Sequence, residues 1–124
     1  MTVHRSLVSV VDDDESVRES LPHLLRKFGF AAQAFASAEE FLASEFVGET
    51  RCLILDVAMP GMSGPALQME LSRRQQAIPI VFITAQGDET VRPRVLEAGA
   101  VECLFKPFSA TALRTALDAA LRVD

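Results

Sequence analysis

Four consecutive acids, Asp12 to Glu15, follow directly after the apolar run "LVSVV". Unit charges about 4 Å apart repel by about 4 kcal/mol at an effective dielectric of about 20, so clustered carboxylates need a cation or raised pKa values. A hard divalent ion suits carboxylate oxygens, and Mg²⁺ keeps several waters when few carboxylates are available. Asp12 and Asp13 are therefore candidate metal ligands, whereas Asp14 and Glu15 are better placed to begin a helix.

Three further reactive side chains stand at the ends of apolar runs. Asp56 ends "CLILD", Thr84 ends "IPIVFIT", and Lys106 follows "VECLF". If these runs are parallel strands, their carboxyl ends lie at one edge of a sheet, where ligands bind in open α/β folds. We therefore predict that the acids after the first run meet Asp56, Thr84 and Lys106 at one rim and share a cation with Asp56.

Apolar runs and helical patterns alternate along the whole chain, and these elements must position the rim. The strand candidates are residues 7–11, 31–35, 52–56, 78–84 and 101–105. A helical pattern follows each run, and the second helix opens with the capping pair Ser37 and Glu40 and extends its buried face to Phe46. Strict alternation implies parallel βαβ units with helices on both faces of the sheet. The sequence thus predicts an α/β, doubly wound fold with five strands and five helices, formed as one domain by residues 1–124.

Composition and charge exclude several classes of protein. Hydrophobic residues make up 49% of the chain and charged residues 23%, which is a globular balance. A net charge of −5 with scattered basic residues argues against direct binding of nucleic acid. No apolar run has the roughly 18 to 20 residues of a membrane span, and acids follow the N-terminus too soon for a signal peptide. Cys52 and Cys103 show no metal-ligand spacing and fit a reducing compartment, so we expect a soluble, cytoplasmic protein without a membrane partner.

Four stretches together carry a resemblance to a known family. They are "VVDDDESVRESL", "LILDVAMPGMSG", "VFITAQGD" and "EAGAVECLFKPF". With them the chain resembles, over essentially its whole length, the receiver domain of two-component response regulators, the CheY-like family. The segments "VRESL" and "MPGMSG" are most similar to those of receivers in nitrogen-fixation-type transcription regulators. The resemblance implies a flavodoxin-like three-layer sandwich with strand order 2-1-3-4-5.

The resemblance also implies a phosphoacceptor site with a metal. Asp56 would be the nucleophile that takes a phosphoryl group from the phosphohistidine of a sensor histidine kinase. Asp13 and Asp56 would bind Mg²⁺ or Mn²⁺ directly, together with the backbone carbonyl of Ala58. Asp12 would bind the same ion through water.

Two more residues acquire roles by the same resemblance. Lys106 and the metal would neutralise charge on the transferring phosphoryl oxygens, and Lys106–Pro107 would be a cis peptide. Thr84 would hydrogen-bond a phosphoryl oxygen. Phosphorylation would shift a pre-existing equilibrium toward an active surface on the fourth helix, fifth strand and fifth helix, between Arg92 and Arg122. That surface would pair with a second copy or with a C-terminal DNA-binding output domain that lies outside this chain.

The sequence departs from the family at the residue three positions before the lysine. Receivers usually carry Tyr or Phe there, and its ring moves inward when the threonine moves, whereas this chain has Cys103. A thiol cannot fill the space of a ring, and repacking of Phe105 or Phe82 is the alternative. Ala58 and Gln86, two residues beyond Asp56 and Thr84, would flank the site and control access of water.

Two other functions compete with the phosphoacceptor switch. An aspartyl-phosphate phosphohydrolase would use a similar sheet and Mg²⁺ site, but such enzymes commonly place a second acid two residues after the nucleophile. Ala58 stands there, so we expect no enzyme beyond slow self-phosphorylation from small donors and autodephosphorylation. An interaction module that is never phosphorylated is the third hypothesis. Cys103 favours it, and the intact acids and Lys106 argue against it.

Overall fold

The computed structural model describes residues 5–85 and 89–122. Within these residues the strands are β1 (Leu7–Val11), β2 (Ala31–Phe35), β3 (Thr50–Asp56), β4 (Ile80–Ala85) and β5 (Glu102–Lys106). The helices are α1 (Glu15–Lys27), α2 (Ala38–Ala43), α3 (Gly64–Arg73), α4 (Val91–Glu97) and α5 (Ala110–Leu121), with a 3₁₀ turn over Val47–Glu49. The predicted alternation of strands and helices is confirmed.

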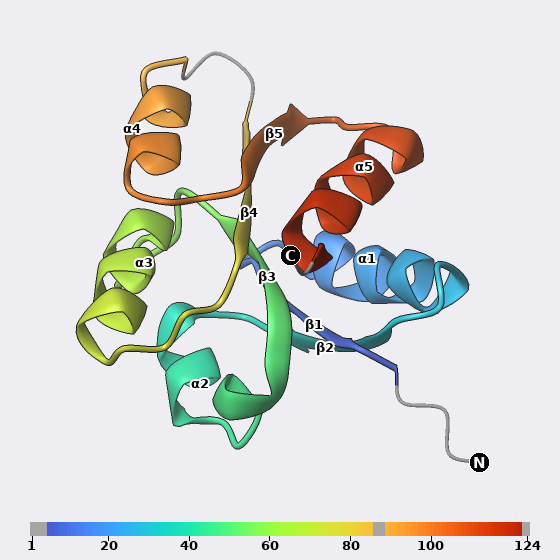
Figure 1. Cartoon of the computed structure of the whole chain (residues 1–124), viewed down its shortest axis with the longest axis horizontal. Coiled ribbons are helices and arrows are strands. Elements are labelled where there is room, and N and C mark those ends of the chain that lie inside the picture. Colours follow the sequence, from blue (N-terminus) through green and yellow to red (C-terminus); the bar gives the residue numbers. More distant parts are fainter. Residues whose placement is uncertain (1–4, 86–88, 123–124) are drawn as a thin grey trace.

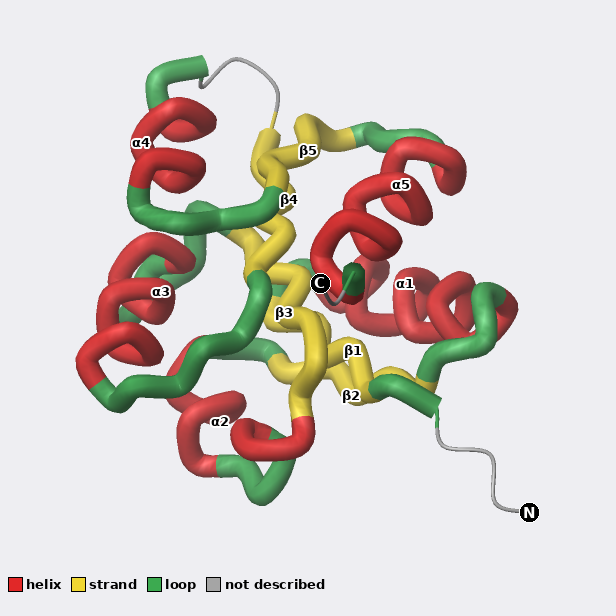
Figure 2. Tube along the Cα trace, viewed as in Figure 1, coloured by secondary structure: helices red, strands yellow, loops and turns green. Residues whose placement is uncertain are grey.

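The strands form one parallel sheet in the order β2-β1-β3-β4-β5. Helices α1 and α5 cover one face, and α2, α3 and α4 cover the other (Figure 1). Figure 2 shows the strands as a central layer between these two groups of helices. The doubly wound, flavodoxin-like sandwich and its strand order are therefore confirmed.

The sheet is buried on both faces at its centre, as the continuous apolar runs predict. Alternate residues of β3 and β4 enter two separate cores because successive side chains of a strand point to opposite faces. Ile54 and Ile83 face α1 and α5, whereas Leu55 and Phe82 face the other three helices, and all four are fully buried. Two packed faces hold the central strands rigidly, so the residues at their carboxyl ends have fixed positions.

Several boundaries differ from the predicted ones. Strand β4 begins at Ile80 instead of residue 78 and ends at Ala85, and β5 runs over Glu102–Lys106 instead of 101–105. Strand β3 begins at Thr50, where the Thr50 hydroxyl lies 2.7 Å from the hydroxyl of Ser9 on β1 and donates to the Phe46 carbonyl, also at 2.7 Å. Helix α2 ends at Ala43, since the hydroxyl of Ser44 donates to the Phe41 carbonyl at 2.7 Å. Phe46 therefore lies beyond the helix, and its assignment to the helix's buried face was wrong. None of the helices in the described residues has the length and apolar composition that crossing a membrane requires.

Candidate functional site

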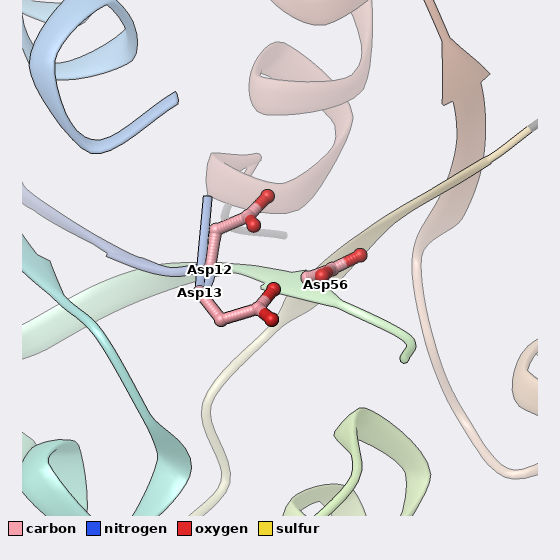
Figure 3. A group of neighbouring side chains, drawn as sticks. All are labelled: Asp12, Asp13 and Asp56. Atoms are coloured by element: carbon pink, nitrogen blue, oxygen red, sulfur yellow. The ribbon is translucent and has the colours of Figure 1, made fainter. Parts of the chain in front are cut away.

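The residues predicted to meet lie at the carboxyl edge of the sheet. Asp12 and Asp13 follow β1, and Asp56 ends β3, the strand paired with β1. Figure 3 shows the three aspartates as neighbours, with side chains extending to the same side of the sheet edge. Thr84 lies near the end of β4, and Lys106 ends β5. The sequence prediction that these residues share one rim is confirmed.

The three aspartates form a compact set of oxygen ligands. One carboxylate oxygen from each lies within 4.8 Å of the others. Asp12 is 0% exposed and Asp56 is 6% exposed, whereas Asp13 is exposed to solvent. Two of the acids are thus held inside the protein, and the third leaves the site open to an incoming group.

Lys106 is the cation of the site. Its Nζ donates a hydrogen bond to Asp12 Oδ2 at 3.0 Å and lies 3.6 Å from Asp56 Oδ1. Partial burial alone would lower the pKa of Lys106, but the hydrogen bond that Lys106 donates to Asp12 and the negative charges of Asp12 and Asp56 raise it above the ordinary value. Lys106 therefore stays protonated beside the two buried carboxylates.

The pKa of Asp56 is strongly shifted by its surroundings. Burial and then repulsion by Asp12 raise its pKa from 3.8 to about 7, although the ammonium of Lys106 opposes the shift and lowers it. The single positive charge of Lys106 does not balance three neighbouring acids. A divalent cation among these oxygens would favour the ionised form of Asp56.

The donor set fits a small, hard cation. Mg²⁺ prefers carboxylate and carbonyl oxygens in octahedral geometry with bonds of about 2.1 Å, which places neighbouring and opposite ligands about 3 to 4 Å apart. The three carboxylates of the site lie within 4.8 Å of one another, close to that span. Ala58, the expected carbonyl donor, is an exposed residue two positions after Asp56 in the loop to α3.

A glycine allows α3 to start directly against the end of β3. The amide of Gly64 donates to the Val57 carbonyl at 2.9 Å, and the Val57 amide donates to the Ile83 carbonyl at 3.0 Å. A Cβ at Gly64 would collide with the backbone carbonyl of Asp56 and would lie 2.9 Å from the ring of Phe82. Only glycine fits there without moving the backbone of Asp56.

The loop after β1 is fixed by contacts that spacing alone did not reveal. Asp12 Oδ1 accepts the amide of Asp14 at 2.9 Å, and Arg18 Nη1 donates to the Asp12 carbonyl at 3.1 Å. Asp14 caps α1 by accepting the amide of Ser16, also at 2.9 Å, which agrees with the prediction that this acid begins the helix. Arg18 was not among the predicted site residues. Its place one turn into α1, directly after the acids, is the signal that could have pointed to it.

Thr84 and Cys103, the residues at the positions expected to transmit the switch, are both buried. Thr84 is buried at 3% exposure. Cys103 is 2% exposed and pairs in register with Phe82, so a small side chain occupies the position where the family usually has a ring. The Lys106–Pro107 peptide is cis, as expected. Gln86 lies outside the described residues, and repacking of Phe82 or Phe105 stays a prediction.

Comparison with known proteins gives one consistent result. The family model of the response regulator receiver domain matches residues 8–118. Nodulation protein W of Bradyrhizobium diazoefficiens is 45% identical over 120 residues, covering 97% of this chain and 53% of that protein. The response regulator protein TodT of Pseudomonas putida is 39% identical over 123 residues, covering 99% and 54%. The crystal structure of FixJ-N superimposes with a TM-score of 0.87 at 37% identity, covering 98% of this chain and 99% of that one. The chain spans about half the length of these two curated relatives.

Proposed function

This chain belongs to the response regulator receiver domain family, and from that premise we propose that Asp56 accepts a phosphoryl group from the phosphohistidine of a sensor histidine kinase. The observation that carries the proposal is the meeting of two buried acids, one exposed acid and a lysine at one edge of the sheet. Receiver domains are signalling domains rather than classical enzymes. Self-phosphorylation from small donors and autodephosphorylation, both slow, are part of the proposal.

The metal of the proposed site is Mg²⁺ or Mn²⁺. Asp13 and Asp56 are the direct carboxylate ligands, the backbone carbonyl of Ala58 is the third protein ligand, and Asp12 contributes through water. Their hard oxygen donors and their spacing within 4.8 Å support this assignment. When bound, the ion supplies positive charge that lowers the repulsion between the acids and the incoming phosphoryl oxygens.

The remaining chemistry belongs to side chains of this chain. An oxygen of the Asp56 carboxylate forms a bond to phosphorus while the bond from phosphorus to the donor's imidazole nitrogen breaks, and the imidazole keeps the electron pair. Lys106, 3.6 Å from Asp56 Oδ1, is placed to stabilise the added negative charge. The hydroxyl of Thr84 would donate a hydrogen bond to a phosphoryl oxygen and so draw the end of β4 toward the site.

The proposed output is a change in the surface formed by α4, β5 and α5. On this face Arg92 Nη2 of α4 lies 2.7 Å from Glu102 Oε1 of β5. A second copy or an output domain would bind the face after phosphorylation. FixJ of Azorhizobium caulinodans and TdiR of Thauera aromatica are transcriptional regulatory proteins, which supports a DNA-binding output domain and a role in transcription. A cytoplasmic location stays a prediction from the sequence.

Intact-mass spectrometry after incubation with acetyl phosphate and Mg²⁺ tests the proposed function. The wild-type protein should gain one phosphoryl group, and the gain should disappear with EDTA or with Asp56→Asn. The matched control is Asp118→Asn on the exposed side of α5, which should be labelled like the wild type. Equal labelling of the Asp56→Asn variant would show that Asp56 is not the phosphoacceptor.

A further inference from the structure

An acid on α2 contacts the loop that follows the proposed phosphoacceptor. Glu39 lies in the first turn of α2, and its Oε2 accepts the backbone amide of Met62 at 3.1 Å. Met62 belongs to the loop of residues 57–63 between β3 and α3. This hydrogen bond therefore joins helix α2 to the β3–α3 loop, between two residues that are 23 positions apart in the sequence.

The turn beside this contact is shaped to receive the carboxylate. Gly61 has a φ of +74°, in the left-handed region that glycine adopts without strain. A Cβ at Gly61 would lie only 2.8 Å from Glu39 Oε2. The absence of a side chain at Gly61 thus leaves room for the Glu39 carboxylate to reach the next amide, that of Met62.

Glu39 contacts the middle of the loop, whereas the backbone hydrogen bonds found within the described residues lie at its two ends. The two ends are fixed by the amide of Gly64, which donates to the Val57 carbonyl at 2.9 Å. Between these ends, Met59 and Met62 pack, partly buried, against the core that contains Phe41 of α2. Apolar packing sets the distance between α2 and the loop, and the directional contact from Glu39 sets the orientation of the turn.

We propose that Glu39 is a positioning residue for the phosphorylation site: it fixes the turn at residues 61–62 and thereby holds the Ala58 carbonyl in place for the metal. The inference rests on the proposed function, in which the backbone carbonyl of Ala58 is a ligand of the metal. Partners that orient metal ligands contribute to affinity by keeping those ligands in the binding geometry before the ion arrives. Glu39 is exposed, and its carboxylate bonds the amide of Met62 in the loop, so its effect on the site passes through the loop.

Three variants of the full chain separate this role from a general effect on α2. Glu39→Ala removes the acceptor, whereas Glu39→Gln keeps a side-chain oxygen that can accept the Met62 amide. Glu40→Ala is the matched control, since Glu40 is the next residue of the same turn and contacts the Ser37 hydroxyl at 3.4 Å instead of the loop. Far-UV circular dichroism verifies that each variant is folded.

Titration of ¹⁵N-labelled protein with Mg²⁺, followed by NMR at the backbone amides of residues 56–58, gives the dissociation constant of each variant. Losing one net hydrogen bond predicts that Glu39→Ala weakens Mg²⁺ binding about threefold to tenfold. Glu39→Gln should restore binding to within about twofold of the wild type, and Glu40→Ala should leave it unchanged. Phosphorylation by acetyl phosphate should slow in Glu39→Ala at low Mg²⁺ and recover at saturating Mg²⁺, because only the affinity is altered.

The possible results separate this inference from the proposed function. Wild-type affinity in Glu39→Ala, or equal weakening in Glu40→Ala, would overturn the inference while leaving the phosphoacceptor site intact. Failure of Glu39→Gln to restore binding would also overturn it, because a neutral acceptor should suffice for the loop contact. A wild-type protein that binds no Mg²⁺ would overturn the proposed metal site and this inference with it.

Discussion

Replacing Asp56 with asparagine should make the metal-free protein more stable at neutral pH. The substitution keeps the shape of the side chain but removes a charge that is almost fully buried beside two other acids. Most substitutions of buried polar residues destabilise a protein, so a gain in stability is a specific expectation.

The magnitude follows from the distances at the site. Each acid within 4.8 Å of Asp56 repels it by at least about 3.5 kcal/mol at an effective dielectric of about 20. Lys106 at 3.6 Å attracts it by about 4.5 kcal/mol under the same assumption, which leaves about 2.5 kcal/mol of net repulsion from the two acids. Burial adds to this penalty, and the rise in the pKa of Asp56 from 3.8 to about 7 corresponds to about 4 kcal/mol. We expect Asp56→Asn to raise the free energy of unfolding by about 2 to 4 kcal/mol.

The effect has a defined dependence on pH. Because the pKa of Asp56 is higher in the folded protein than in the unfolded chain, the folded state binds more protons between these two values. The free energy of unfolding of the wild type should therefore rise as the pH falls from about 7 toward about 4. The advantage of Asp56→Asn should shrink over the same range, because its amide does not titrate.

Urea unfolding in EDTA, monitored by far-UV circular dichroism, measures this difference. Wild type and Asp56→Asn are compared near pH 7.5 and near pH 4, with the exposed Asp118→Asn as the control for loss of one acid. Equal stability of wild type and Asp56→Asn near pH 7.5, or a gain of the same size in Asp118→Asn, would refute the reasoning.

Three further predictions concern the frame of the site and its ligands. Gly64→Ala should lower the free energy of unfolding by about 2 kcal/mol or more in urea unfolding. Gly48→Ala should cost far less, because a Cβ there meets nothing within 4 Å, and similar losses in the two variants would contradict the role given to Gly64. Lys106→Met should cost about 2 to 4 kcal/mol near neutral pH because it leaves the buried Asp12 without its cation, and an unchanged urea midpoint would count against that ion pair. Mg²⁺ at about ten times its dissociation constant should add about 1.4 kcal/mol to wild-type stability in a thermal melt, and Asp13→Asn should lose that gain; an equal gain in the variant would remove Asp13 from the ligand set.

The fold could be predicted because its determinants are local in the sequence. The apolar runs of β3 and β4 are continuous since both faces of these strands are buried, and helical patterns stand between all the runs. Parallel strands bring their carboxyl ends to one edge, so the sequence alone suffices to place Asp12, Asp56 and Lys106 together. The chemistry of the site thus follows from topology and residue type.

The parts that could not be predicted depend on contacts between distant residues. Thr50 extends β3 because its hydroxyl meets that of Ser9, 41 residues earlier, and no local pattern encodes that pair. Arg18 and Glu39 likewise act on backbone groups of other segments, the Asp12 carbonyl and the Met62 amide. Spacing identifies which side chains lie on a helix face, but not which exposed side chain bends over to a neighbouring loop.

The most direct test of the central claim maps the phosphoryl group to a residue. The protein is incubated with acetyl phosphate with and without Mg²⁺, reduced with borohydride and digested, and the peptides are sequenced by mass spectrometry. The account predicts reductive conversion at Asp56, dependent on Mg²⁺, with Asp12 and Asp13 unmodified. Modification at another acid, or equal modification of Asp56 without a divalent ion, would contradict the claim that this cluster binds a cation and prepares one carboxylate for phosphorylation.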